Sequence, residues 1–165
     1  MRGMRMVRPI DLEGILLLEG IPRPLIAKFA DACAMQTYGE GAVIFEEGSE
    51  AREFYMLKEG KVLLEVEIAP DIIISLGSIK KGCSFGWSAL VKDGTHTTFA
   101  VAAEPCSVIS IPGGKFLEIL ESDPKVGYLV MTRIFQIFRR RLERRTRQFI
   151  KVMRKHPDIQ KLVEL

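Results

Sequence analysis

The stretch Gly82–Ala102 reads GCSFGWSALVKDGTHTTFAVA, and the rest of the chain is interpreted outward from it. It places Phe85-Gly86 and a helix-compatible run, Ser88–Val91, between two apolar segments typical of β-strands. A polar loop, Lys92–Thr98, leads into the second segment. A glycine turn followed by one helical turn can present backbone N–H groups to an anion. The alternative, a tight turn whose glycines serve geometry alone, stays open from this stretch by itself.

Length and composition predict a single globular domain spanning residues 1–165, large enough to bury a core. No run approaches the roughly 18 apolar residues of a membrane span, and the N-terminus lacks the apolar core of a signal peptide. The three cysteines are scattered and form no CxxC pair. We therefore expect a cytoplasmic protein with no metal or other cofactor and no membrane association.

The charge is unevenly distributed along the chain. From Pro124 onward twelve lysines and arginines face three acids, a net charge of +9, so the preceding residues carry −6 of the overall +3. This basic tail fits a solvated helix face, nonspecific phosphate contact, an anionic membrane surface or an acidic partner. The few residues after His156 cannot form a helix-turn-helix unit, so we expect no sequence-specific DNA binding.

Helical signals occupy both ends of the chain. Residues 12–34 predict two N-terminal helices, the first over Asp11–Glu19 with Asp11 as N-cap and the second opened by Pro22 and Pro24. Residues 115–155 predict a short helix, Lys115–Glu121, and then a long one capped by Asp123. The long helix should reach about Lys155 and span roughly 45 Å.

Residues 37–112 consist of short runs of branched and aromatic residues separated by glycine turns, a pattern typical of an antiparallel roll. The roll would include the short helix of the stretch Gly82–Ala102. The predicted strands are Val43–Phe45, Phe54–Leu57, Val62–Ile68, Ile72–Leu76 and Val108–Ile111.

The long helix carries a heptad stripe, at spacings that alternate between four and three. Its positions are Met131, Phe135, Phe138, Leu142, Arg145, Phe149 and Val152, with Arg145 the one interruption. We expect a homodimer whose seam is formed by Met131, Phe135, Phe138, Leu142 and Phe149. A second stripe, Val126, Val130, Ile134 and Ile137, could pack on the roll; the alternative is one broad face packed within the monomer.

Two glycine-punctuated patterns carry a family resemblance: Gly41-x3-Phe45-x2-Gly48, and Phe54-Tyr55-x-Leu57-x2-Gly60-x-Val62. Together with Phe85-Gly86, Ala89-Leu90 and Ala102, they resemble the cyclic-nucleotide-binding domain family, which includes the catabolite activator protein and the regulatory subunits of protein kinase A. The resemblance covers about Leu12–Arg154. It implies an α+β fold: an antiparallel β-roll, or jelly-roll-like barrel, with N-terminal helices and a long C-terminal helix.

The chain departs from this family at the two charged positions of its phosphate-binding cassette. Members that bind cAMP or cGMP follow Phe-Gly with a Glu that holds the ribose hydroxyl, and later present an Arg that pairs with the phosphate. The corresponding residues here are Trp87 and His96. Losing a charge-assisted bidentate pair typically costs a few kcal/mol, or roughly a hundredfold in affinity. We therefore expect no ordinary binding of cyclic nucleotides.

The resemblance leaves three functional hypotheses. The first is a stand-alone sensory or regulatory module for an unknown small molecule, with a pocket formed by Phe85, Gly86, Trp87, Ser88, Ala89, Leu90, His96, Thr97 and Thr98. The second is a ligand-free dimeric interaction module, and the third a cyclic-nucleotide binder with an unusual cassette. An unknown protein partner would receive any signal. No catalytic triad, metal cluster or P-loop is present, so we do not expect an enzyme.

Overall fold

Among residues 5–163, which the structure, a computed structural model, describes, nine strands pair into two antiparallel sheets. The sheet orders are β1-β2-β9-β4-β7 and β3-β8-β5-β6. The strands are β1 (Arg5–Met6), β2 (Ala34–Tyr38), β3 (Val43–Phe45), β4 (Glu53–Glu59), β5 (Lys61–Ala69), β6 (Ile72–Lys80), β7 (Ser84–Phe85), β8 (Phe99–Ala102) and β9 (Cys106–Pro112). This is the predicted antiparallel roll, and the five strands expected from the sequence are all present as β3, β4, β5, β6 and β9.

The core of the roll lies between the two sheets. Buried side chains from both meet there, among them Phe45 of β3, Leu57 of β4 and Ala100 of β8. Successive residues of a strand point to opposite faces, so Leu57 lies inside while its neighbour Met56 is buried on the other face of β4. This alternation gives the five-stranded sheet two apolar faces, one for the roll and one for the helices.

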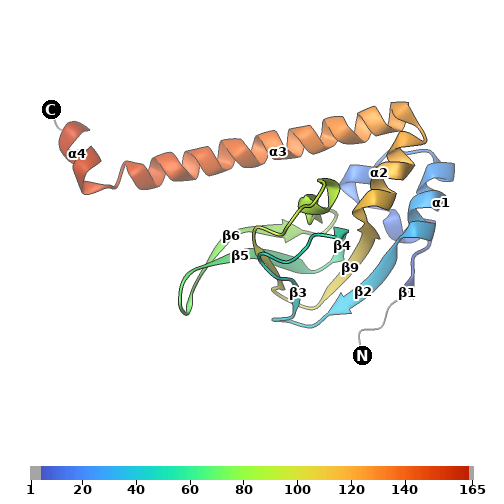
Figure 1. Cartoon of the computed structure of the whole chain (residues 1–165), viewed down its shortest axis with the longest axis horizontal. Coiled ribbons are helices and arrows are strands. Elements are labelled where there is room, and N and C mark those ends of the chain that lie inside the picture. The colour runs from blue at the N-terminus through green and yellow to red at the C-terminus, as the bar shows by residue number, and fades with distance from the viewer. Residues whose placement is uncertain (1–4, 164–165) are drawn as a thin grey trace. The chain divides into compact units, whose positions relative to one another are not determined.

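Two helices, α1 (Arg23–Ala32) and α2 (Gly113–Glu121), lie beside the five-stranded sheet (Figure 1). The contact is aromatic: the ring of Phe116 in α2 lies 5.5 Å from that of Phe29 in α1 and 4.8 Å from that of Phe54 in β4, measured between centroids. All three rings are fully buried. Burying a phenylalanine contributes about 1.5–3 kcal/mol, so this cluster attaches the helices to the sheet.

The prediction of a single first helix near the N-terminus is wrong. Asp11–Glu19 is not one helix but parts of two short 3-10 helices, η1 (Pro9–Leu12) and η2 (Leu16–Leu18). Gly14 between them has a φ of +80°, which ends helical geometry. Asp11 is not the N-cap either, because its carboxylate reaches back to the N-cap residue Arg8 from inside the first turn.

The chain forms two compact units, one ending at Gly127 and one beginning at Tyr128. The long helix α3 (Pro124–Met153) starts where predicted: the Asp123 carboxylate accepts hydrogen bonds from the N–H groups of Lys125 and Val126, at 3.1 and 3.2 Å. It ends two residues earlier than expected. Pro157 then opens a further helix that the sequence analysis did not predict, α4 (Pro157–Val163).

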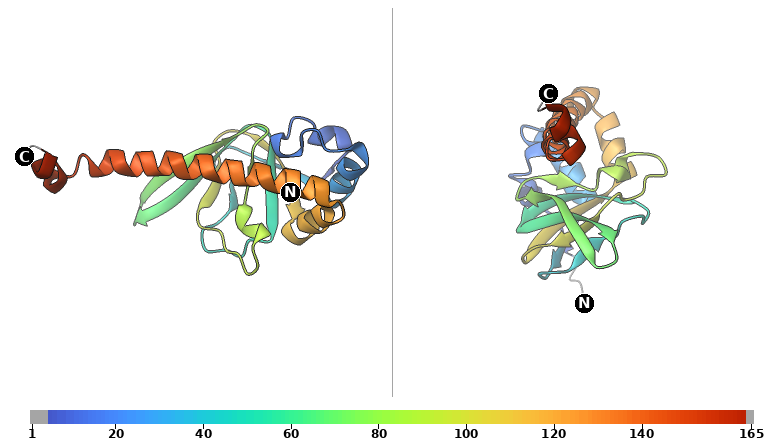
Figure 2. Two further views of the ribbon diagram at one scale, coloured as in Figure 1. Left: turned by 90° about the horizontal axis from the view of Figure 1, so that it is seen from above. Right: turned by 90° about the vertical axis from the view of Figure 1, so that its left-hand side faces the viewer.

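The heptad stripe of α3 is exposed along the second unit, where α3 is a continuous helix (Figure 2). Phe135 is 69% and Leu142 67% exposed, and Met131, Phe138 and Phe149 are exposed as well. Contiguous exposed apolar side chains on one helix face are typical of an interaction surface. On the second stripe Val126, Val130 and Ile134 are buried, and Ile137 is partly buried.

We predict that Asp11 stabilises the N-terminal segment as an ionised carboxylate. The Arg8 N–H donates to it at 2.9 Å and the Arg5 guanidinium at 3.0 Å, and these hydrogen bonds lower its pKa to about 2. Asp11→Asn keeps one acceptor oxygen but removes its charge, so it should lower the free energy of unfolding at pH 7 by about 1–2 kcal/mol, the order expected when hydrogen bonds to a charged group lose that charge.

Urea unfolding at several pH values measures this effect. A carboxylate whose pKa is lowered by folding contributes fully above its unfolded pKa near 3.8, and that contribution disappears as pH falls toward 2. The free energy of unfolding of Asp11→Asn should lack this pH-dependent contribution, whereas that of the exposed control Asp31→Asn should keep it. Equal stabilities for Asp11→Asn and the wild type at pH 7 would contradict the assignment.

Candidate functional site

The cassette consists of β7, a glycine turn and the short 3-10 helix η3 (Trp87–Leu90). Gly86 joins them with a φ of +74°. A Cβ at this position would lie 2.6 Å from Cδ2 of Tyr55, so both conformation and space require glycine. The N–H of Ala89 donates to the Gly86 carbonyl at 3.1 Å and that of Val91 to the Ser88 carbonyl at 3.2 Å. These two N–H groups are therefore engaged within the cassette.

Phe85, the residue before the turn, points into the roll. It is fully buried, and its ring stacks on Tyr55 with centroids 5.2 Å apart and lies 6.0 Å from Phe45. Phe45 in turn lies 5.6 Å from Tyr55. The three rings form one cluster beneath the cassette, contributed by β3, β4 and β7.

His96 completes this cluster. Its imidazole lies parallel to the Phe45 ring, with an interplanar angle of 8° and centroids 3.6 Å apart, and the residue is only 4% exposed. Two backbone hydrogen bonds hold the loop: His96 N–H donates to the Ser49 carbonyl at 2.9 Å, and Gly48 N–H donates to the His96 carbonyl at 2.7 Å. Burial lowers the pKa of His96, so the ring is mainly neutral at pH 7.

Trp87 belongs to a different cluster. Its ring centroid lies 4.9 Å from that of Phe54, and Phe54 contacts Phe116 of α2. The indole therefore packs with the rings between the sheet and the helices, while Phe85, two residues earlier, packs inside the roll. Residues Trp87–Leu90 are all only partly buried.

The remaining residues of the predicted pocket differ in burial, because successive residues of an extended segment point to opposite sides. Thr98 is buried like His96, whereas Thr97 between them is exposed. The cassette also packs tightly against the start of α2, because a Cβ on Gly113 would collide with the carbonyl of Ala89. Nothing in the sequence around Gly113, between Pro112 and Gly114, predicts this contact, because it depends on how the cassette and α2 meet in the fold.

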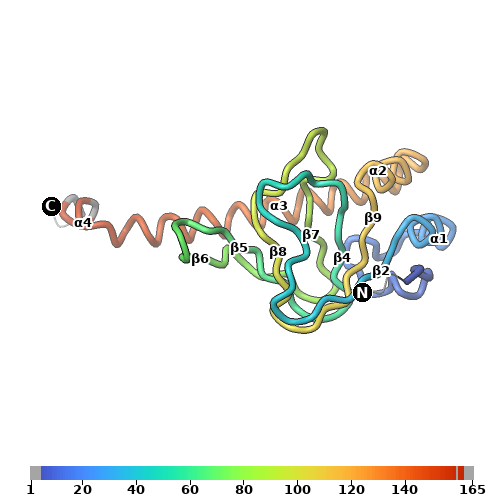
Figure 3. The backbone as a smooth tube through the Cα atoms, turned by 60° about the horizontal axis from the view of Figure 1, so that its bottom comes forward, coloured from blue at the N-terminus to red at the C-terminus, as the bar shows by residue number. Residues whose placement is uncertain are grey.

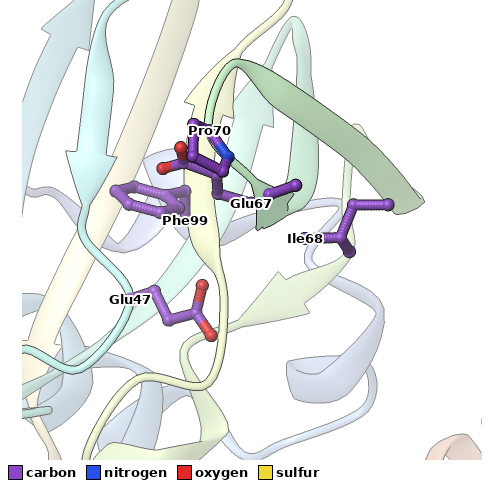
Figure 4. A pocket seen from close by; sticks show the side chains of 6 residues that line it. Glu47, Glu67, Ile68, Pro70 and Phe99 are labelled. Atoms are coloured by element: carbon purple, nitrogen blue, oxygen red, sulfur yellow. The ribbon is translucent and has the colours of Figure 1, made fainter.

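An open pocket of roughly 490 Å³ lies away from the cassette, at the end of the β5–β6 hairpin (Figure 4). Its lining residues are Glu47, Glu67, Ile68, Ala69, Pro70 and Phe99. None of them belongs to the predicted ligand pocket. Its carboxylates come from the segment after β3 and from β5, with the Phe99 ring contributed by β8.

Other chemistry has little support in the part of the chain that the structure describes. There, no three His, Cys, Asp or Glu side chains come together in a way that could hold a metal ion. Burial raises the pKa of Cys33 to about 12, so its thiol is a poor nucleophile. None of the helices in residues 5–163 has an apolar stretch long enough to cross a membrane.

The family follows from comparison with known proteins. Residues 35–123, more than half of the chain, match the family model described as the cyclic nucleotide-binding domain. The chain therefore belongs to this family, as the resemblance implied. This makes it a protein with the fold of a regulatory sensing module, and the match by itself leaves its ligand undecided.

Individual relatives agree with the family. Over 97 residues the chain is 31% identical to human cGMP-dependent protein kinase 2, a match that covers 56% of this chain and 12% of the kinase. A cyclic nucleotide-binding domain from Methylobacillus flagellatus superposes with a TM-score of 0.75 at 15% identity, covering 94% of this chain and 89% of that one. The Thermus thermophilus catabolite activator protein superposes with a TM-score of 0.69 at 21% identity, covering 83% and 62%. At these identities the two structures show the fold alone.

We predict that the buried, neutral state of His96 makes the protein sensitive to mild acid. Folding lowers this pKa, so the unfolded state takes up a proton that the folded state resists. The contribution is fully present above the unfolded pKa near 6.5 and is lost as pH falls below it.

Thermal unfolding from pH 7.5 to 5.5 measures this. His96→Phe, which keeps a ring for stacking, should have a shallower loss of stability than the wild type. The exposed His156→Gln is the control and should keep the wild-type profile. Parallel profiles for His96→Phe and the wild type would show that His96 is not the titrating group.

Proposed function

We propose that this protein is a regulatory interaction module of the cyclic nucleotide-binding family that does not hold cAMP or cGMP and that acts as a homodimer through α3. The observation that carries the proposal is the stack of His96 on Phe45, with ring centroids 3.6 Å apart. The residue at the family's arginine position is a core aromatic in this chain.

Charge explains why this stack opposes nucleotide binding. A cyclic phosphate carries a negative charge, and a guanidinium binds it through two parallel charge-assisted hydrogen bonds. A neutral imidazole stacked on Phe45 provides neither the positive charge nor the two parallel N–H donors of a guanidinium. At the family's glutamate position, the indole of Trp87 can donate a hydrogen bond but cannot accept one from a ribose hydroxyl.

Space favours the same proposal. The rings of Phe45, Tyr55, Phe85 and His96 pack together beneath the cassette. A ligand entering there would have to separate them and lose their stacking, which is worth about 0.5–1.5 kcal/mol per aromatic pair beyond the burial of apolar area. The protein's own side chains thus replace a ligand in stabilising the roll.

A sensor for another small molecule is the second candidate. The partial exposure of Trp87–Leu90 favours it, because these residues leave an accessible rim on the cassette. In either case we propose no catalytic activity and no cofactor. We place the protein in the cytoplasm, where its three free cysteines would stay reduced.

We predict that neither cAMP nor cGMP at 1 mM shifts thermal unfolding of the wild type. A ligand specific for the folded state at a hundred times its Kd adds about 2.7 kcal/mol, which would be visible as a shift of several degrees. The double variant Trp87→Glu with His96→Arg restores both charged groups and should bind more tightly than the wild type in calorimetry. A clear shift of the wild type with either nucleotide would refute the proposal.

We predict that the double variant Phe138→Lys with Leu142→Lys is a monomer by sedimentation equilibrium under conditions where the wild type is a dimer. Two added positive charges on each helix in the seam would be desolvated beside the like charges of the basic helix. The matched control places the same charges off the seam, at the exposed positions Gln136 and Ile150. A dimer that persisted in the seam variant would exclude the seam.

A further inference from the structure

The charge of α3 is a problem for the proposed homodimer. The helix carries nine lysines and arginines but a single acid, Glu143, which pairs with Arg139 at 3.5 Å. Two copies side by side would double this positive charge in a small volume, and like charges at close range repel. Carboxylates from outside the helices would offset this repulsion.

Arg145 places a positive charge within the apolar stripe itself. It occupies a heptad position between Leu142 and Phe149, and it is exposed as they are. Any surface that covers the apolar stripe must also accept this guanidinium. A buried guanidinium without a partner is strongly destabilising, whereas one paired with carboxylates is tolerated.

The β5–β6 hairpin has the complementary character. Between Lys61 and Lys80, which pair with each other at its base, it contains three acids, Glu65, Glu67 and Asp71, and no further lysine, arginine or histidine. It also exposes the side chains of Ile68, Ile72, Ile73 and Ile74, and those of the strand residues Ile72–Ile74 alternate between its two faces. Figure 3 shows the hairpin of β5 and β6 reaching beyond the rest of the roll.

The pocket at the end of this hairpin has the chemistry that a guanidinium requires. Figure 4 shows Glu47, Glu67 and the ring of Phe99 around it. Carboxylates pair with arginine through charge-assisted hydrogen bonds, and an aromatic face attracts the same cation. Ile68 and Pro70 supply apolar surface for the methylene stem of an arginine side chain.

We infer that the pocket of Glu47, Glu67 and Phe99 receives arginine side chains of α3 from a second copy of the chain. Both surfaces combine apolar side chains with charge, and the signs of their charges are opposite. The inference rests on the proposed homodimer, and it adds a second contact that offsets the repulsion between the two basic helices.

The test is the dimer dissociation constant of the full chain, measured by sedimentation equilibrium at several salt concentrations. Glu47→Arg with Glu67→Arg should weaken the dimer roughly tenfold, as expected for two partly exposed ion pairs that are lost and reversed. The matched control, Glu13→Arg with Glu40→Arg, makes the same change of net charge at exposed sites outside the hairpin and should have a much smaller effect.

Charge exchange identifies the partner surface. Arg144→Glu with Arg145→Glu should also weaken the dimer, and combining it with the reversed hairpin should restore the dissociation constant to within about threefold of the wild type. Equal effects of the hairpin and control variants would overturn the inference. The inference would also be overturned if the combined charge-exchange variant did not restore the dimer. It would likewise be overturned if the two pairs of substitutions affected each other only in the free energy of unfolding, because that would indicate a contact within one copy. A monomeric wild type would instead remove the proposed homodimer itself.

Discussion

The stack of His96 on Phe45 is the contact on which the organisation of the cassette depends. It joins the loop before β8 to the end of β3, and Phe45 extends the same cluster to Tyr55 of β4 and Phe85 of β7. Four segments distant in sequence thus meet through one set of rings. Because aromatic pairs in a dry interior add to the energy of area burial, the cluster stabilises the position of the cassette on the roll.

The burial of position 96 makes it costly to place a charge there, which favours histidine over arginine. A guanidinium in the same place would be a buried charge, tolerated only with an anion beside it. An imidazole can lose its charge and remain as a flat ring, because its pKa lies close to neutrality and burial lowers it further. In a roll that lacks an anionic ligand, histidine is therefore easier to accommodate than arginine.

Local signals in the sequence predicted most of the roll and the start of α3. The strands follow from branched and aromatic residues between glycines, and Asp123-Pro124 marks the helix start, whose capping bonds the structure contains. The same kind of local reasoning failed at Asp11, because a residue suited to capping can act from inside the first turn. It also could not show that Phe85 and Trp87 enter different clusters, since that depends on how β7 and η3 turn around Gly86.

The roll glycines show that family membership rests on the fold and does not by itself determine a ligand. Gly60 has a φ of +91°, and a Cβ there would lie 2.6 Å from the carbonyl oxygen of Pro105. That constraint comes from the chain's own backbone and is the same whether or not a ligand is bound. Trp87 and His96 are under no such backbone constraint, so they can change while the roll persists. The residues that identify the family are those that the fold requires, whereas the resemblance places Trp87 and His96 at the two cassette positions where its nucleotide-binding members have a glutamate and an arginine.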